Sequence, residues 1–361
     1  MKILFITEHF YPHIGGAEKL LLDLASSLVR HGHDVRVLTS NSGGAKGSHT
    51  YGGIKIHSYR WNTFFGHPIP SKKDIYPQIS WADIVQTAQY TAAPTALKCA
   101  KKMNKPCVMM SYEYLGKRWR QVDNPIRAKL FELFEWWVFH KPYDKFVAIS
   151  KSSKKDLLRS KINPNKVSVV YPVFNDFNFW KTKNKPSVKS LKTFLFYGRP
   201  GKTKGVFILL EAIKNLNKTL TKDINFSFIL SDDPLKEKKR LIALVDKYQL
   251  NDRITILDSQ SQDELKNSII ESYCVIVPSL TEGFGYSAYQ ACMLGKNIIV
   301  SDAGSLPEVI SGNCLIFKNG DSNTLELAIK KASNGKFVSY TDRIGGDNTK
   351  KMVELYTGLI Q

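Results

Sequence analysis

Residues 2–39 of the chain read KILFITEHFYPHIGGAEKLLLDLASSLVRHGHDVRVLT. An apolar run at 2–7 leads into a turn-rich segment that contains Gly15 and Gly16. Leucines then recur at helical spacing until a stop near Gly32, and a second strand is predicted at 34–39. This order of strand, glycine loop, helix and strand predicts the opening of a doubly wound α/β domain.

The same alternation of strands and helices continues beyond this stretch. Residues 175–190 are rich in Asn, Lys, Pro and Ser, the composition of a linker, and a strand and helix at 194–197 and 205–217 then restart the pattern. We expect an N-terminal Rossmann-like domain at 1–172, a linker at 173–190 and a C-terminal Rossmann-like domain at 191–345. The last helix, at about 346–361, is expected to pack back on the first domain. Further strands are predicted at 84–85, 107–110, 146–149, 167–170, 225–230, 253–257, 274–277, 297–300 and 314–317.

Length and composition limit the class of protein. At 361 residues the chain exceeds the usual size of a single core, and its 43% apolar and 23% charged residues are ordinary for a globular protein. No segment approaches the roughly 18 consecutive apolar residues of a membrane-spanning helix, and the first residues turn charged too early for a signal peptide. The five cysteines are scattered, which predicts reduced thiols and no zinc site. A cytoplasmic protein is expected.

The charge balance points to anionic partners. With 52 Lys and Arg against 32 Asp and Glu the net charge is +20, which attracts nucleotide diphosphates, acidic lipid headgroups or nucleic acid. Nucleic acid is the least favoured of these, because the sequence lacks the usual recognition modules and the charge is spread along the chain.

Residues 275–291 carry the strongest functional signal and read VIVPSLTEGFGYSAYQA. A buried strand runs into a loop with two glycines, and a helix is predicted to begin at about Tyr286. Glycines let the backbone approach a ligand closely, and the amides of a helix N-terminus bind anions such as phosphate. Glu282 is expected at the mouth of this site and Gln290 about one turn into the helix.

This stretch resembles the family-4 retaining glycosyltransferases, also called glycosyltransferase group 1. Their signature is a Glu-x7-Glu pair in a Pro-Ser-x-x-Glu-Gly-Phe-Gly setting. The resemblance implies that Glu282 addresses the donor hexose, and that the backbone from Gly283 through Phe284 and Gly285 to Tyr286 holds the donor diphosphate. It also implies that the second glutamate, which grips the ribose, is replaced here by Gln290. A neutral hydrogen bond in place of a charge-assisted one weakens this contact by about 1 kcal/mol.

A second signal follows the first strand of the C-terminal half, where residues 198–205 read GRPGKTKG. The family carries Arg and Lys at matching places, which implies that Arg199 and Lys204 stabilise the leaving diphosphate. Fixed cations aimed at a departing anion lower the barrier to its departure. Lys202 fits less well, because only Lys204 precedes the glycine.

Two features of the N-terminal half extend the resemblance. The family uses a Gly-Gly loop to approach the donor, which gives this role to Gly15 and Gly16. These glycines lack the GxGxxG spacing of a nicotinamide site. Where the family usually places a histidine before an acidic residue at a strand end, this chain has Tyr112 before Glu113. A phenol can bond a sugar hydroxyl but does not titrate near neutrality, so these two residues are candidate sugar or acceptor contacts, with a packed aromatic as the alternative for Tyr112.

The pair Asp232-Asp233 is a candidate metal site that we reject. Turn formation before Pro234 explains both aspartates, and the cationic residues Arg199 and Lys204 make a divalent ion unnecessary. We therefore expect no metal and no cofactor, with the nucleotide sugar as co-substrate.

A basic and aromatic segment in the first half is a candidate membrane or acceptor-phosphate contact. It comprises Lys117, Arg118, Trp119 and Arg120. Cations on lipid phosphates with aromatics at the interface are typical of proteins that lie on an anionic leaflet. The segment suggests a peripheral position at the inner face of the cell membrane.

The following stretch, 126–139, also combines aromatic with basic residues and leaves two alternatives open. It either lies on an anionic leaflet as an amphipathic helix or is a core helix. The core alternative rests on Leu130, Leu133, Phe134 and Trp137, whose spacing fits one buried face.

The resemblance covers nearly the whole chain and implies the GT-B architecture, with two facing Rossmann-like domains and a cleft between them. It implies a metal-independent hexosyltransferase that moves a hexose from a nucleotide diphosphate sugar to a glycan or lipid-linked acceptor, with retention of configuration, in polysaccharide or glycolipid synthesis. Two alternatives stay open. The replacements at Tyr112 and Gln290 motivate a catalytically weakened nucleotide-sugar binder, and the net charge motivates a nucleic-acid-binding α/β protein.

Overall fold

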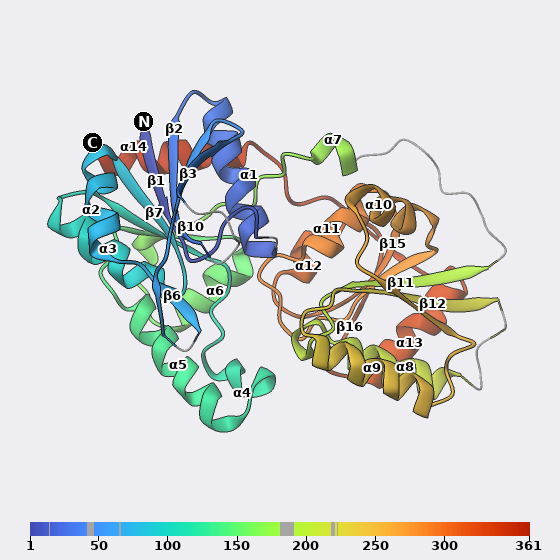
Figure 1. The fold of residues 1–361 in the computed structure, drawn as a ribbon. Coiled ribbons are helices and arrows are strands. Elements are labelled where there is room, and N and C mark those ends of the chain that lie inside the picture. The colour runs from blue at the N-terminus through green and yellow to red at the C-terminus, as the bar shows by residue number, and fades with distance from the viewer. Residues whose placement is uncertain (14, 42–46, 65, 181–190, 218–220, 222) are drawn as a thin grey trace. The chain divides into compact units, whose positions relative to one another are not determined.

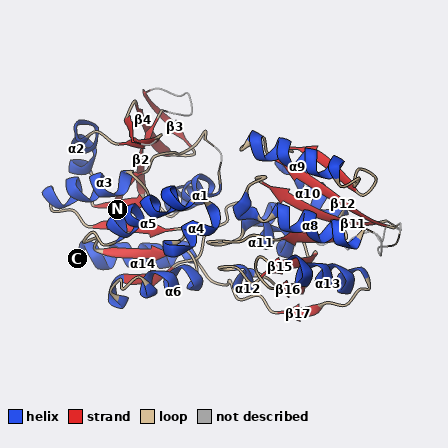
Figure 2. Ribbon diagram, turned by 90° about the horizontal axis from the view of Figure 1, so that it is seen from below, coloured by secondary structure: helices blue, strands red, loops and turns tan. Residues whose placement is uncertain are grey.

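The computed structural model describes residues 1–361 except 14, 42–46, 65, 181–190, 218–220 and 222. The chain divides into two compact units, Met1–Asn175 with Gly346–Gln361, and Asp176–Gly345 (Figure 1). Each unit has a mostly parallel sheet with helices over both of its faces (Figure 2). The expected α/β class with two Rossmann-like domains is confirmed.

The first unit is built on an eight-stranded sheet of order β10-β9-β8-β7-β1-β2-β4-β3, in which only the edge pair β3–β4 is antiparallel. Its elements are β1 (Lys2–Ile6), α1 (Gly16–Arg30), β2 (Asp34–Ser40), β3 (Gly47–Tyr51), β4 (Ile54–Tyr59), β5 (Asn62–Phe64), β6 (His67–Ile69), α2 (Lys72–Trp81), β7 (Ile84–Ala88), α3 (Ala92–Lys102), β8 (Cys107–Ser111), the 3₁₀ turn η1 (Gly116–Arg118), α4 (Trp119–Val122), α5 (Pro125–Phe139), β9 (Lys145–Ala148), α6 (Lys151–Arg159), η2 (Pro164–Lys166), β10 (Val167–Val169) and α14 (Asn348–Ile360).

The second unit has a seven-stranded sheet of order β13-β12-β11-β14-β15-β16-β17, in which only β17 is antiparallel to its neighbour. Its elements are α7 (Phe177–Trp180), β11 (Lys192–Gly198), η3 (Lys202–Lys204), α8 (Val206–Leu216), β12 (Ile224–Leu230), α9 (Leu235–Lys247), β13 (Ile254–Asp258), α10 (Gln262–Glu271), β14 (Cys274–Val277), α11 (Tyr286–Met293), β15 (Asn297–Ser301), α12 (Leu306–Val309), β16 (Gly312–Phe317), α13 (Ser322–Ser333) and β17 (Val338–Tyr340).

The central strands read as continuous apolar runs because helices cover both faces of each sheet. Every residue of β7, β8 and β14 is buried, which is the pattern of parallel strands in doubly wound domains. Apolar side chains of α2, α3, α5 and α6 pack with the first sheet, and those of α8, α9 and α13 pack with the second. The core of each unit therefore lies between its sheet and its own helices.

The chain ends in the first unit. In α14, Thr349 Oγ1 lies 2.8 Å from Ser27 Oγ, and the buried Tyr356 hydroxyl donates to Gln86 Oε1 at 2.8 Å. The start of the expected linker forms the short helix α7, whereas residues 181–190 lie outside the described part of the chain.

Each sheet has a switch point, where the chain reverses the direction in which it adds strands. The order in the sheets places it between β1 and β7 in the first unit and between β11 and β14 in the second. Ligands of open α/β sheets bind in the crevice outside the carboxyl ends of the strands at such points. The loops that follow β1, β7, β11 and β14 are therefore where the functional residues are expected.

Candidate functional site

The switch point of the second unit carries the two strongest sequence motifs. The segment 199–205 follows β11 and includes η3, and the segment 278–285 follows β14 and ends at the N-terminus of α11. The amide of Leu280 donates to the carbonyl of Thr203 at 2.8 Å and joins the two segments. The motifs, which lie about 80 residues apart in sequence, are thus neighbours.

Glu282 and Lys204 form an ion pair across these two segments. Lys204 Nζ lies 2.8 Å from Glu282 Oε2, and Ser279 Oγ donates to the same oxygen at 3.0 Å. The side chain of Glu282 is 13% exposed and that of Lys204 is 35% exposed, so water screens the pair only in part. The structure therefore brings together two of the three residues that sequence assigned to catalysis.

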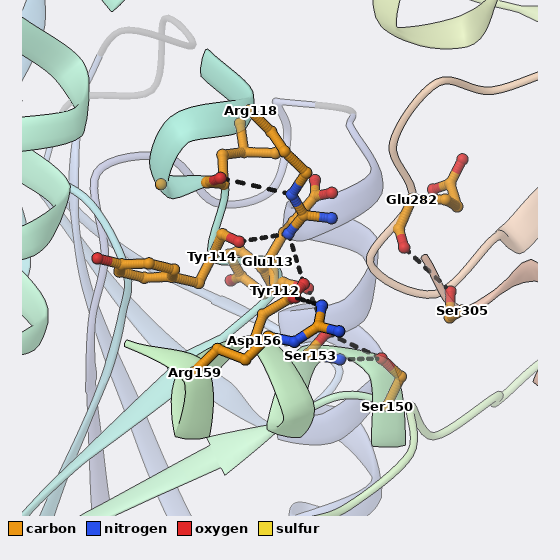
Figure 3. Close-up of polar contacts among 12 residues, drawn as sticks. Tyr112, Glu113, Tyr114, Arg118, Ser150, Ser153, Asp156, Arg159, Glu282 and Ser305 are labelled. Atoms are coloured by element: carbon orange, nitrogen blue, oxygen red, sulfur yellow. Dashed lines mark hydrogen bonds and ion pairs between the residues drawn. The ribbon is translucent and has the colours of Figure 1, made fainter. Parts of the chain in front are cut away.

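The backbone of Glu282 is held in place as firmly as its side chain. Its carbonyl oxygen accepts hydrogen bonds from the amide of Ser305 at 3.1 Å and from Ser305 Oγ at 3.2 Å (Figure 3). A carboxylate fixed by its own backbone and by two side-chain donors is suited to positioning a ligand, because little order has to be gained when the ligand binds.

Gly205 is required for this arrangement. Its φ is +68°, and a Cβ at this position would lie 1.8 Å from the carbonyl oxygen of Pro278. Only glycine lets the segment after β11 approach the segment after β14 this closely. In the sequence analysis, Lys204 was preferred over Lys202 because it precedes Gly205. The structure thus gives a reason for a glycine at this position.

Arg199 is placed differently from Lys204. Its guanidinium contacts Asp233, with Nη2 2.6 Å from Oδ2 and Nε donating to the backbone carbonyl at 3.3 Å. Both side chains are more than 60% exposed, so the pair contributes only about 0–1 kcal/mol and can be exchanged for another anion. The structure does not pair Arg199 with Glu282; it lies at the carboxyl end of β11 against Asp233.

The start of α11 has the geometry expected for an anion site. Gly285 caps the helix with φ +93°, and Tyr286 is its first residue. The ring of Phe284 is 2% exposed and packs against the rings of Tyr286 and Tyr289, with centroids 5.6 Å apart in both cases. The buried ring anchors the loop that leads into the N-terminus of α11, where amide groups and the helix dipole favour anions.

Gln290 lies in the second turn of α11 beside β11. Its Oε1 is 3.4 Å from the hydroxyl of Tyr197, which donates to the carbonyl of Ser287 at 2.7 Å. Burial raises the pKa of Tyr197 and keeps its hydroxyl protonated. The side-chain oxygen of Gln290 is thus directed toward β11.

In the first unit, the expected glycine loop leads directly into α1. Gly15 caps the helix and Gly16 is its first residue. The carboxylate of Glu18 folds back over this end, with Oε2 only 2.2 Å from where a Cβ on Gly15 would lie. The N-terminus of α1 therefore already faces a negative group, as the helix dipole favours.

Glu8 is a buried carboxyl group at the switch point of the first unit that sequence analysis did not single out. It follows β1 at the switch point, is 5% exposed, and accepts hydrogen bonds from Thr91 Oγ1 at 2.5 Å and from the amide of Ala92 at 2.9 Å. Thr91 Oγ1 also lies 2.7 Å from the carbonyl oxygen of Pro68. The hydroxyl has one hydrogen for two acceptors, so a protonated Glu8 satisfies both contacts. Consistently, burial raises the pKa of Glu8 to about 7. The signal in the sequence was its position as the first charge after β1.

Tyr112 and Glu113 lie at the carboxyl end of β8. Both of their amides donate to Gln89 Oε1, at 2.9 and 3.1 Å, and the carbonyl of Tyr112 accepts from Ser153 Oγ at 2.9 Å (Figure 3). The Tyr112 side chain is 8% exposed, with its ring 6.2 Å from that of Tyr90. Tyr90 has a φ of +110°, a strained value for a residue with a side chain. The packed-aromatic alternative for Tyr112 agrees with this burial.

The basic segment 117–120 is partly used inside the first unit. The guanidinium of Arg118 contacts Asp156 and donates to the carbonyl of Tyr114 at 2.5 Å (Figure 3). Trp119 Nε1 donates to Glu135 Oε2 at 3.2 Å. Two members of the segment are thus bound by protein groups, and the exposed members are Lys117 and Arg120.

Both aspartates of the rejected metal site are engaged by cations. Asp232 Oδ1 lies 2.6 Å from Lys238 Nζ, and Asp233 is bound by Arg199. Among the described residues, no group of three His, Cys, Asp or Glu side chains is placed to hold a metal ion. All five cysteines are free, and all except Cys292 are buried.

No helix within the described ranges is both long and apolar enough to cross a bilayer.

Two doubly wound α/β units, with polar loops at the switch point of each, define the GT-B class of folds. Two family models match the chain in tandem: Glycosyltransferase Family 4 over residues 14–176 and Glycosyl transferases group 1 over residues 178–351. The chain belongs to this family of glycosyltransferases, and the resemblance inferred from the sequence motifs is confirmed.

Curated relatives are similar over most of the chain. The gpi3 component of the phosphatidylinositol N-acetylglucosaminyltransferase of Schizosaccharomyces pombe is 24% identical, with 89% of this chain and 70% of the relative covered. A GDP-mannose:cellobiosyl-diphosphopolyprenol alpha-mannosyltransferase of Xanthomonas oryzae is 24% identical, with 84% and 79% covered.

Solved structures share the fold over the full length. Sucrose-phosphate synthase from Thermosynechococcus elongatus has a TM-score of 0.74 at 18% identity, covering 100% of this chain and 95% of that one. HepE of Anabaena in complex with UDP-glucose has a TM-score of 0.72 at 17% identity, covering 100% and 96%.

Proposed function

We propose that the protein is a retaining hexosyltransferase that moves a hexose from a nucleotide diphosphate sugar to a glycan or lipid-linked acceptor in polysaccharide or glycolipid synthesis. The observation that carries the proposal is the Lys204–Glu282 pair, 2.8 Å apart, beside the N-terminus of α11. It combines a cation, a fixed carboxylate and a helix dipole, which are the groups that a diphosphate linked to a sugar requires.

Each of these groups has a distinct role in the proposal. The backbone at 283–286 binds the diphosphate, Lys204 and Arg199 neutralise the charge that gathers on it, and Glu282 accepts hydrogen bonds from hexose hydroxyls. Arg199 has to leave Asp233 to bind the diphosphate. Because that ion pair is exposed, breaking it costs little free energy. Gln290 contacts the ribose as a neutral acceptor and donor.

The reaction proceeds at one face of the sugar. The bond between hexose C1 and the diphosphate oxygen breaks, the acceptor hydroxyl oxygen bonds to C1 from the same side, and the acceptor proton passes to the departing diphosphate. The charge that builds up on the leaving group is where fixed cations stabilise the transition state more than the ground state.

The names of the relatives support a nucleotide sugar and a lipid-linked acceptor. That of the Xanthomonas relative includes GDP-mannose and a diphosphopolyprenol, that of the Schizosaccharomyces relative includes phosphatidylinositol, and the HepE structure contains UDP-glucose. These names differ in sugar and base, so an experiment has to identify the donor of this chain.

A thermal-shift panel of UDP-, GDP- and ADP-sugars tests the donor part of the proposal. A matching donor raises the melting temperature by mass action, and the donor that does so is then incubated with polyprenyl-diphosphate and inositol-lipid acceptors to detect a glycosylated product. Transfer with inverted configuration would contradict the retaining mechanism. Donor binding without transfer or donor hydrolysis would instead favour the catalytically weakened binder.

A further inference from the structure

The outer face of α5 is apolar and exposed. Ile126, Leu130, Leu133 and Trp137 follow one another at intervals of four, three and four residues, so they form one stripe along the helix. Their exposed fractions are 77%, 54%, 52% and 45%, and Trp136 beside them is 53% exposed. We call these five residues the α5 stripe.

The orientation of α5 overturns one of the alternatives drawn from sequence. The core-helix alternative required Leu130, Leu133, Phe134 and Trp137 to be buried; Phe134 packs against the core of the first unit, and the other three are exposed. The residues of α5 that are buried are Ala128, Glu135, Val138 and Phe139. A helix of a globular domain normally buries its wide apolar stripe, and exposed apolar patches mark interaction surfaces.

The exposed charged side chains around the α5 stripe are all cationic. From residue 117 to residue 140, the exposed charged side chains are Lys117, Arg120, Arg127 and Lys129. The three acids of the same segment are less exposed and already bound: Asp123 faces Arg127, Glu132 faces Lys129, and Glu135 is buried. The surface is therefore apolar with a cationic margin.

The cationic turn and the α5 stripe are fixed to each other. Glu135 on α5 accepts hydrogen bonds from the amides of Leu115 and Gly116, at 3.0 and 2.7 Å, and from Trp119 Nε1 at 3.2 Å. The ring of Trp119 packs on Phe131 with centroids 5.0 Å apart. In Figure 1 the short helix α4 lies at one end of α5, at the edge of the first unit. One carboxylate thus holds the turn that carries Lys117 and Arg120 to the helix that carries the stripe.

We propose that the α5 stripe, together with Lys117, Arg120, Arg127 and Lys129, docks the first unit onto the surface of an anionic lipid bilayer. Leucine and isoleucine enter the acyl boundary, tryptophans prefer the headgroup level, and cations bind lipid phosphates, so the apolar stripe and its cationic margin both find partners in one environment. A second copy of the chain fits less well. A symmetric contact would bring the like-charged margins of two copies together.

This inference goes beyond the proposed function and is tested without it, because it concerns binding to lipid rather than sugar transfer. The full chain is floated with vesicles of phosphatidylcholine alone and of equal parts phosphatidylcholine and phosphatidylglycerol. We expect flotation with the anionic vesicles, weakening as salt screens the charges. Failure to float with them, or equal flotation with neutral vesicles, would overturn the proposal.

The double variant Leu130→Glu/Leu133→Glu tests the stripe. Two carboxylates in the centre of the surface oppose both the apolar contact and the anionic lipid, so flotation is expected to fall by at least about tenfold. Leu327→Glu is the matched control, because Leu327 is 56% exposed on α13 of the second unit and its replacement leaves flotation unchanged. Far-UV circular dichroism and the melting temperature verify that both variants fold.

The double variant Arg120→Gln/Arg127→Gln tests the cationic margin, and it is expected to lower flotation with anionic vesicles and to reduce its dependence on salt. Sedimentation velocity of the wild-type chain without lipid tests whether a second copy of the chain binds this face instead. Self-association abolished by Leu130→Glu/Leu133→Glu, in a chain that does not float, would assign the face to a second copy and refute lipid docking.

Discussion

Lys204 and Glu282 are joined by a short ion pair at the centre of the proposed donor site. We expect Lys204→Ala to lower kcat by about a hundredfold, because it removes a fixed cation from the leaving diphosphate. Glu282→Ala is expected to lower turnover as strongly, because the hexose loses the group that orients it. Steady-state kinetics with the matching donor measure both effects.

The control for this prediction lies in the same turn. Lys202 is exposed two residues earlier in η3, and Lys202→Ala is expected to keep nearly wild-type turnover with the same circular dichroism spectrum. Nearly unchanged rates in both Lys204→Ala and Glu282→Ala would refute the site assignment, whatever the result for Lys202.

Gln290 tests the consequence of a neutral side chain at the ribose position. Gln290→Glu is expected to keep or improve donor affinity, because a carboxylate accepts stronger hydrogen bonds from ribose hydroxyls than an amide does. Titration calorimetry with the nucleotide diphosphate gives the affinity directly. A large loss would show that the donor capacity of the amide is needed, and Tyr197 beside it would then be the first residue to examine.

Glu8 links protonation to stability. Its pKa is about 7 in the folded chain against an ordinary value of 4.5, so the folded chain holds the proton more tightly than the unfolded chain does. The stabilisation is fully present below pH 4.5 and is lost as the pH rises through about 7, a change of about 3 kcal/mol in the free energy of unfolding. Glu135, whose pKa burial also raises to about 7, acts with the same sign.

Glu8→Gln removes one of these two contributions. We expect the variant to lose about half of the decline in unfolding free energy between pH 4.5 and 7 and to be more stable than the wild type above pH 7. Urea unfolding over a pH series measures this, with the exposed Glu354→Gln as control. An unchanged pH dependence would mean that Glu8 is ionised in the folded chain and that Thr91 donates to it alone.

Sequence predicted the motif residues better than it predicted their partners. The position of Glu282 in its loop followed from the signature and the helix after it, whereas its contact with Lys204 depends on two strands being neighbours in the sheet. Glu8 escaped notice because its burial beside Thr91 results from the packing of the segments after β1 and β7 with β6. No spacing in a single sequence encodes such a contact.

At the scale of elements, periodicity predicted the strands and helices that matter for the site. Each expected strand overlaps an observed one, because buried parallel strands are continuous apolar runs. Among the strands that were missed, β3 and β17 lie at sheet edges, are almost entirely exposed and carry little apolar signal, whereas β4 lies between β2 and β3, and β5 and β6 form a separate pair. In α5 the period was correct but left two alternatives open, because spacing shows that a stripe exists and not what covers it.

Gly205 gives a prediction at the scale of elements, because it lets the segments after β11 and β14 approach each other. Gly205→Ala is expected to lower the free energy of unfolding by about 3 kcal/mol and to abolish transfer, since the new Cβ would collide with the carbonyl of Pro278 and force the loops after β11 and β14 apart. Gly335 is the matched control: its φ is +70° and nothing lies within 4 Å of a Cβ there.

Gly335→Ala therefore bears only the cost of the left-handed backbone, about 1 kcal/mol, and leaves transfer intact. Chemical denaturation of both variants measures the difference, which isolates the close approach from the backbone strain. Equal losses in the two variants would show that the contact between the loops is not what requires glycine at position 205.

At the scale of the whole molecule, the proposed function relies on positive charge to stabilise the diphosphate. The chain carries a net charge of +20, and the proposed site takes its positive charge from Lys204 and Arg199. Asp232 is bound by Lys238 and Asp233 by Arg199. In the proposed function, fixed cations supply the charge that stabilises the departing group.

We therefore expect transfer to continue unchanged after exhaustive treatment with a chelator, and added magnesium or manganese to leave kcat and KM as they are. The measurement compares initial rates of the chelator-treated chain with and without each metal, with the matching donor held at saturation. The Lys204→Ala variant, treated in the same way, reports whether the lysine carries the charge in the absence of metal. If chelation abolished the activity and a divalent ion restored it, a metal would carry the leaving-group charge, and the role proposed for the two cationic side chains would have to be given up.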